Sequence, residues 1–152
     1  MAINTDKFMA KFKGGARPNL YRIECPILPS EFAILCKTSQ LPGADVGVID
    51  KKFLGKQLKI KGDITYPDLS VTLELDVNDP VRTALELWLA DPSLKATISV
   101  FQLDKDGNDI MHYEYLYAWP SSMAAIEQGQ DSSDTISEYT VTFPYNEWLR
   151  IK

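Results

Sequence analysis

The sequence has few of the residues that build covalent, metal-binding or catalytic sites. Its 152 residues include two cysteines and one histidine, His112. A chain of this length can bury roughly 70% of the surface that its unfolded form exposes, so it needs neither disulfides nor metals to fold. No cysteine lies near His112 in sequence, which argues against a zinc site. A serine–histidine–aspartate triad assembles in space without fixed spacing, but the Gly-x-Ser-x-Gly nucleophile elbow is absent.

Loops that hold ions or phosphates are also absent. Residues 104–109 (DKDGND) resemble a calcium loop, but an EF-hand loop starting at Asp104 requires glycine at its sixth position and glutamate at its twelfth. The chain has Asp109 and Tyr115 there, so a hairpin turn is the better interpretation. The Gly14-Gly15 pair lacks the Gly-Lys-Ser/Thr of a phosphate-binding loop. We therefore expect no catalytic residues, no metal and no cofactor.

Long apolar runs are missing too. The longest uncharged apolar segments are far shorter than the ~20 residues that cross a bilayer. Residues 1–15 contain no apolar core of signal-peptide length. We expect a single domain over residues 1–152 that is made in a cytoplasm and is not inserted into a membrane.

The two cysteines, Cys25 and Cys36, lie at equal distances from the middle of the Pro29-Ser30-Glu31 turn. A hairpin around this turn would place them opposite each other, either as a disulfide or as two small apolar residues on neighbouring strands. We favour two reduced thiols, because a cytoplasm is a reducing compartment.

Charge is distributed unevenly along the chain. Residues 1–62 contain 11 basic and 5 acidic residues, a net charge of +6, whereas residues 63–152 contain 5 basic and 16 acidic residues, a net charge of −11. A basic and an acidic surface would allow copies to assemble head to tail. Alternatively, both sets of charges share one solvated surface and neutralise each other within the monomer.

Period-two alternation of apolar and polar residues predicts a mainly β protein. In residues 69–77, Val71, Leu73, Leu75 and Val77 share one face. The expected strands are residues 20–27, 32–38, 46–53, 57–61, 69–77, 95–103, 110–118 and 135–143. We expect the first two strands to pair as a hairpin. The alternation in residues 57–61 predicts a half-buried strand. Residues 120–133 are expected to form a loop with at most a short helix.

One helix interrupts the strands. Asp79 is a good N-cap, Pro80 suits the first helical position, and the Asp91-Pro92 pair ends the segment. About eight strands and one amphipathic helix predict a β-sandwich or barrel with the helix on its flank, and residues 1–19 form an N-terminal arm. The edges of such a sheet invite pairing with another chain.

Aromatic side chains recur at every second position near residue 115. They are Tyr113, Tyr115, Tyr117 and Trp119, preceded by Met111. Such a ladder can stack single-stranded bases, but it is more often one wall of a core or an interface. The net charge of −5 argues against nucleic acid as the partner.

Four segments carry a resemblance to a known family. They are residues 16–21 (ARPNLY), 32–42 (FAILCKTSQLP), 59–73 (KIKGDITYPDLSVTL) and a closing stretch, 119–148, that begins with Trp-Pro and ends on Trp. Their order and spacing resemble the tail tube protein of contractile-tailed bacteriophages, over most of the chain. The compact stretch of residues 91–98 departs from the longer insertion expected in some relatives.

The resemblance implies a structural protein. Proteins of this kind form hexameric rings whose sheets join edge to edge into a barrel-like tail tube around a channel, and the rings stack inside a contractile sheath. The implied partners are identical copies, the tail sheath protein, the tape-measure protein, the baseplate and tail terminator proteins, and double-stranded DNA that passes without specific binding. The implied location is the virion tail, assembled in the cytoplasm of a bacterial host.

Three sets of surface residues then become candidates. An acidic channel wall that repels DNA phosphates is assigned to Glu74 and Asp76. Ring stacking is assigned to Lys11, Lys13, Arg17, Lys51, Lys52 and Lys56, and sheath contact to Arg82 and Glu86. Two alternatives remain: the tube of a phage-like bacteriocin or secretion machine, and a monomeric β-barrel that binds a small ligand or single-stranded nucleic acid.

Overall fold

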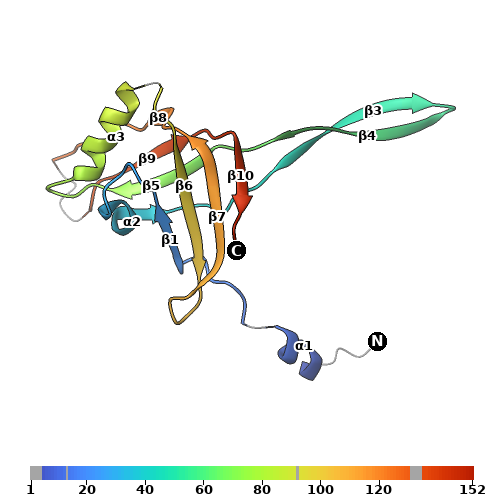
Figure 1. Cartoon of the computed structure of the whole chain (residues 1–152), viewed down its shortest axis with the longest axis horizontal. Coiled ribbons are helices and arrows are strands. Elements are labelled where there is room, and N and C mark those ends of the chain that lie inside the picture. Colours follow the sequence, from blue (N-terminus) through green and yellow to red (C-terminus); the bar gives the residue numbers. More distant parts are fainter. Residues whose placement is uncertain (1–4, 13, 92, 131–134) are drawn as a thin grey trace.

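Two four-stranded antiparallel sheets form the body of the protein, in a computed structural model that describes residues 5–12, 14–91, 93–130 and 135–152 (Figure 1). Sheet A has the order β1 (Tyr21–Glu24), β6 (Ala96–Leu103), β7 (Asp109–Ala118), β10 (Glu147–Arg150). Sheet B has the order β2 (Cys36–Thr38), β5 (Leu69–Glu74), β9 (Glu138–Phe143), β8 (Ser122–Met123). The mainly β, sandwich-like fold predicted from the sequence is confirmed.

The core lies between the two sheets and follows the predicted alternation. Val71 and Leu73 of β5 are fully buried, and so is Val141 on the neighbouring strand β9. Ile98 and Val100 of β6 supply the facing layer from sheet A. The intervening residues of β5 and β9 point outward, so these two strands of sheet B each have one apolar and one polar face.

The flanking helix α3 (Pro80–Ala90) forms where it was predicted. The Asp79 carboxylate accepts hydrogen bonds from the backbone nitrogens of Val81 and Arg82, both at 3.0 Å, and Pro80 needs no partner for a backbone N–H. Val81, Leu85 and Trp88 form the buried stripe, with the Trp88 ring 5.8 Å from that of Phe143. The helix therefore closes one side of the core.

The predicted hairpin of residues 20–27 and 32–38 is wrong. Residues Glu31–Leu35 form a short helix, α2, that buries Phe32, and β2 begins only at Cys36. The strand β1 pairs with β6 of sheet A, whereas β2 pairs with β5 of sheet B. Cys25 and Cys36 are consequently not hairpin partners, and both are buried free thiols. A short apolar run suits either a helix or a strand, and here burial of Phe32 decides for the helix.

A long hairpin, β3 (Asp45–Phe53) with β4 (Lys56–Thr65), extends away from the body (Figure 1). Both strands were predicted, but residues 57–61 are not half-buried: every residue of the hairpin except Gly62 is exposed. Leu54 and Gly55, both with positive φ, form its two-residue tip. Near the base the register shifts between Val46 and Val48, where the backbones of Gly47 and Gly62 meet closely.

Several strand ends differ from the sequence expectation. The strand β5 ends at Glu74, which leaves Leu75 only partly buried and Val77 96% exposed. The aromatic ladder is broken at Tyr117, whose φ of +57° and neighbouring register shift place Ala118 in the core instead. The helix α1 (Thr5–Lys11) and the strands β8 and β10 were not predicted. No described helix is long and apolar enough to cross a membrane.

Candidate assembly surfaces

The hairpin of β3 and β4 exposes many apolar side chains. Eight of them are 43% to 85% exposed: Val46, Val48, Ile49, Phe53, Leu54, Leu58, Ile60 and Ile64. Lys51, Lys52 and Lys56 lie in the last three residue pairs before the tip, so basic groups surround exposed Phe53 and Leu54. An apolar surface of this extent, which the body does not cover, is typical of a surface that another protein covers.

The N-terminal arm presents a second basic and aromatic surface. The rings of Phe8 and Phe12 stack with centroids 5.1 Å apart, and both remain at least half exposed. Lys11 and Arg17 are also exposed, whereas Lys13 lies outside the described residues. A groove of about 620 Å³ separates residues 11–17, Lys13 excepted, from the β6–β7 turn. Phe8, Met9 and Phe12 of the arm are therefore apolar side chains that the body leaves at least half exposed.

The outward face of sheet B is a polar wall. On β5 it presents Ser70, Thr72 and Glu74, and on β9 it presents Glu138, Thr140 and Thr142 in register with them. Thr72 and Thr140 share a 3.2 Å hydrogen bond between their hydroxyl groups. The Lys37 ammonium group pairs with Glu138 at 2.8 Å, and this carboxylate raises the pKa of Lys37. Sequence alone missed the β9 half of this face, because the pairing joins residues 68 positions apart.

The two acidic residues assigned to the channel wall differ in position. Glu74 lies on the outward face of sheet B, opposite Glu138. Asp76 lies just beyond the end of β5, where its carboxylate accepts a 2.8 Å hydrogen bond from the backbone nitrogen of Val77. Glu74 is therefore a wall residue of sheet B, and Asp76 lies at its end.

The helix α3 exposes less free charge than its sequence suggests. Arg82 pairs with Glu86 at 3.4 Å, and its guanidinium carbon lies 4.7 Å from the centre of the Tyr139 ring. The Arg82 side chain is only 25% exposed, against 57% for Glu86. Glu86 and the exposed Leu87 are therefore the more accessible groups on this helix.

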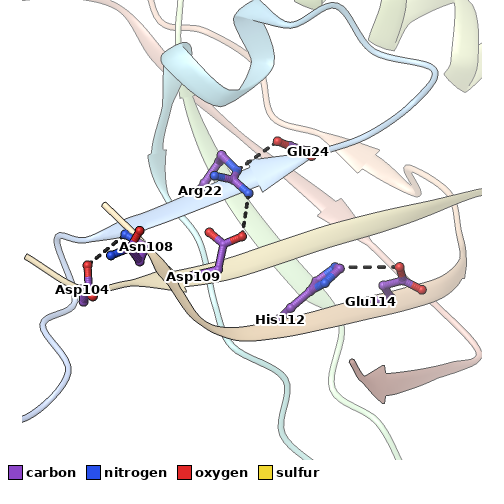
Figure 2. A network of polar contacts seen from close by, with 7 residues as sticks. All are labelled: Arg22, Glu24, Asp104, Asn108, Asp109, His112 and Glu114. Carbon is purple, nitrogen blue, oxygen red and sulfur yellow. Dashed lines mark hydrogen bonds and ion pairs between the residues drawn. The ribbon is translucent and has the colours of Figure 1, made fainter. Parts of the chain in front are cut away.

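A polar network occupies the outward face of sheet A, across three neighbouring strands (Figure 2). Arg22 pairs with Glu24 at 2.9 Å and with Asp109 at 3.2 Å, and its guanidinium carbon lies 4.1 Å from the centre of the Phe101 ring. His112 stacks on Phe101 at the same centroid distance, 4.1 Å. These stacks leave Phe101 only 8% exposed, although it points away from the core.

Neither His112 nor the acidic turn between β6 and β7 is arranged as a metal site. His112 Nε2 lies 3.8 Å from a carboxylate oxygen of Glu114. Asp104 accepts hydrogen bonds from the backbone nitrogens of Asp106 and Asn108, which lowers the pKa of its carboxyl group and closes the predicted hairpin turn. Among the residues that the structure describes, no group of three or more His, Cys, Asp or Glu residues is arranged to hold a metal ion.

Burial keeps the two cysteines protonated. Burial raises the pKa of both thiols from 9.0 to about 11, because the charged thiolate would lose its hydration there. The nearby Tyr21 hydroxyl donates to the backbone oxygens of Cys36 and Lys37, at 3.0 and 2.6 Å. Both thiols are therefore core groups rather than reactive nucleophiles.

Together, a polar-faced sandwich, a projecting basic hairpin and an exposed arm define a protein that is built to assemble. Solved structures share the fold. The chain matches a protein in the baseplate of the anti-feeding prophage with a TM-score of 0.76, at 12% identity, over 92% of this chain and 97% of that one. It matches a protein in the sheath–tube complex of the extracellular contractile injection system PVC with a TM-score of 0.73, at 14% identity, over 98% of both chains.

Curated relatives make the likeness more specific. The chain is 25% identical to tail tube protein gp19 of Enterobacteria phage T4, over 94% of this chain and 98% of that protein, and equally so to gp19 of phage T6. A type six secretion system protein matches less closely, with a TM-score of 0.54 at 16% identity over 86% of this chain and 81% of that one. No family model matches the sequence. The resemblance to phage tail tube proteins and the tail tube fold, both predicted from the sequence, are confirmed.

Proposed function

We propose that this protein is the structural subunit of the inner tube of a contractile phage tail, built from stacked hexameric rings. Its similarity to phage tail tube proteins over almost the whole of both chains carries the proposal. The location is then the virion tail, and assembly in the host cytoplasm is part of the proposal. The role is structural rather than catalytic.

Ring formation rests on the open edges of the two sheets. Sheet B ends at β2 and β8, which are only 3 and 2 residues long. Sheet A ends at β1 and β10, each of 4 residues. Edge strands present unpaired backbone donors and acceptors, and closing subunits into a ring satisfies them. Identical copies are therefore the first partner.

The channel wall is assigned to the outward face of sheet B, with Glu74 on the wall and Asp76 at its end. Hydroxyl groups cover this face, and its free charges are acidic once Lys37 has paired with Glu138. Like charge repels DNA phosphates, so genome passing through such a channel does not stick. In a reconstruction of the tube, Glu74 facing the bore would support the assignment, and Glu74 buried between neighbouring subunits would contradict it.

Stacking is assigned to the basic residues of the hairpin and the arm. Exposed apolar groups lie beside Lys51, Lys52 and Lys56 in the hairpin and beside Lys11 in the arm, with Arg17 nearby. Lys13 belongs to the same proposal from its sequence position alone. A surface that mixes apolar anchors with one sign of charge suits a heterologous contact that repeats along a filament.

The external partners follow from the setting of a contractile tail. The sheath would surround the tube and contact α3 at Glu86 and Arg82, and the baseplate and terminator proteins would bind its two ends. The tape-measure protein and double-stranded DNA would occupy the channel in turn. The tube of a bacteriocin or secretion machine is the nearest alternative, and the genes beside the coding sequence would separate the two.

Negative-stain electron microscopy of the purified protein tests the proposal. We expect rings and, at higher concentration, tubes of constant width. Sedimentation over the same concentration range gives an independent measure of mass. A monomer at every concentration would contradict the proposal and favour the alternative of a monomeric β-barrel that binds a small ligand or single-stranded nucleic acid.

A further inference from the structure

The hairpin and the far end of sheet B lie at opposite ends of the molecule (Figure 1). The chain enters β3 after Thr38, the last residue of β2, and leaves β4 to begin β5 at Leu69. Both connections are at the end of sheet B where β9 finishes, at Phe143. The other end of the sheet is therefore where β5 finishes and β9 begins, at Glu74 and Glu138.

This opposite end has a distinct surface, here called the acidic end, formed by Asp76, Val77, Glu127 and Ile136. The backbone nitrogen of Leu75 donates a 2.8 Å hydrogen bond to the oxygen of Ser137, which brings the segments of Asp76 and Ile136 together beyond the strands. Val77 is 96% exposed and Ile136 is 65% exposed. Beyond β8, the backbone nitrogen of Ala124 donates a 2.9 Å hydrogen bond to the oxygen of Thr140 on β9, so the chain heads toward the same end, and Glu127 three residues further on is exposed.

We propose that the tip of the hairpin of one copy docks on the acidic end of the copy in the next ring. The inference rests on the proposed function, and it names the surface that receives the hairpin. In a stack that repeats by translation along one axis, a surface at one end must meet a surface at the opposite end. Phe53 and Leu54 then cover Val77 and Ile136.

Charge complementarity selects this partner surface. The tip carries Lys51, Lys52 and Lys56, and no acidic residue lies between the first and the last of these. The acidic end carries Asp76 and Glu127 beside its two exposed apolar residues. Opposite charges steer and orient such a contact, while burial of the apolar groups stabilises it. The same charges disfavour the reverse pairings, tip to tip and end to end, so the stack keeps one direction.

Two charge-reversed variants test the contact. The first, Lys51→Glu with Lys52→Glu, has an acidic tip and an acidic end. The second, Asp76→Lys with Glu127→Lys, has a basic tip and a basic end. All four positions are exposed, so both variants are expected to fold and to form rings. Each variant alone places like charges in contact. We therefore expect the amount of polymer that sediments to be about tenfold lower than for the wild type, or lower still.

A mixture of the two variants gives the decisive result. Rings that alternate between the variants restore opposite charges at every contact, so an equal mixture is expected to sediment and to show tubes. As a matched control, the first variant mixed with the wild type is expected to shorten tubes, because its tip meets only acidic ends. Sedimentation and negative-stain images give the readout.

The outcomes separate this inference from the function on which it rests. If the wild type forms tubes but the mixture of variants does not, the hairpin docks elsewhere and the inference is wrong. It is equally wrong if either variant alone polymerises as the wild type does. If the wild type itself never forms rings or tubes, the proposed function fails instead.

Discussion

At the scale of single residues, two leucines on α3 show that burial determines how much a side chain stabilises the fold. Leu85 is fully buried in the core, whereas Leu87, two residues along, is 70% exposed. We expect Leu85→Ala to lower the free energy of unfolding by about 2–5 kcal/mol, because it removes buried methyl groups and leaves a cavity. The matched control Leu87→Ala is expected to change it by less than about 0.5 kcal/mol. Urea unfolding of both variants measures the difference, and equal effects would contradict the packing of α3.

The two thiols give a pH dependence whose sign follows from their burial. An unfolded thiol ionises above its pKa of 9.0, but Cys25 and Cys36 stay protonated in the folded state up to about pH 11. The unfolded state therefore binds fewer protons between these two pH values, and stability falls as pH rises through that window. Below pH 9 the thiols are protonated in both the folded and the unfolded state, so they cause no change of stability with pH there.

We expect the free energy of unfolding to fall by up to about 1.4 kcal/mol per pH unit for each thiol between pH 9 and pH 11. Guanidinium unfolding at half-unit steps of pH measures this slope. The double variant Cys25→Ala, Cys36→Ala removes both groups and should flatten the curve, most clearly between pH 9 and 10, below the pKa of an unfolded tyrosine. A slope unchanged in that variant would show that other groups cause the loss.

At the scale of elements, the hairpin depends on a close backbone approach between two glycines. A Cβ added at Gly62 would lie 2.9 Å from the backbone oxygen of Gly47, so the strands would have to separate. We expect Gly62→Ala to reduce tube growth several-fold, since it redirects the hairpin, and to leave the unfolding of the body nearly unchanged. Sedimentation measures the first effect and urea unfolding the second.

Gly43 provides the matched control for that prediction. It precedes the hairpin, its φ is not positive, and a Cβ there would meet no atom within 4 Å. Gly43→Ala is therefore expected to assemble as the wild type does. Equal assembly of both variants would mean that the direction of the hairpin does not govern stacking.

Elements that carry local signals were predictable, and those decided by distant packing were not. The sequence placed α3 within its observed bounds, because an N-cap, a proline and an apolar stripe all lie within twelve residues. It misassigned residues 32–35 as part of a strand, because burial of Phe32 against other elements outweighs the strand-like pattern there. The short strands β8 and β10 had no detectable pattern, since 2 and 4 residues hold too little periodicity.

At the scale of the whole molecule, the basic hairpin and the acidic end lie on opposite sides of the body (Figure 1). Within the monomer, Arg22 and Lys37 of the basic first part pair with Asp109 and Glu138 of the acidic second part, so part of the charge is neutralised on shared surfaces. The lysines of the hairpin tip lie apart from the acidic end. Salt weakens attraction between exposed charges, because the screening length falls from about 10 Å at 0.1 M to about 3 Å at 1 M.

We therefore expect tube growth to need a several-fold higher protein concentration in 1 M than in 0.1 M sodium chloride. Light scattering or sedimentation across a concentration series measures the threshold, and urea unfolding at both salt concentrations serves as the control for the body. A threshold that is unchanged or lower in 1 M salt would show that apolar contacts, rather than charges, dominate stacking.

The sequence by itself determined the β-rich class, the cap and face of α3, the basic hairpin and the likeness to tail tube proteins, because each depends on neighbouring residues or on their order along the chain. Only the tertiary structure decided that β1 and β2 belong to different sheets, that Thr140 joins Thr72 on one polar face, and that the hairpin leaves the body with both faces exposed. These features arise from contacts between residues far apart in the chain, and from surface that the body leaves uncovered, neither of which a local pattern records.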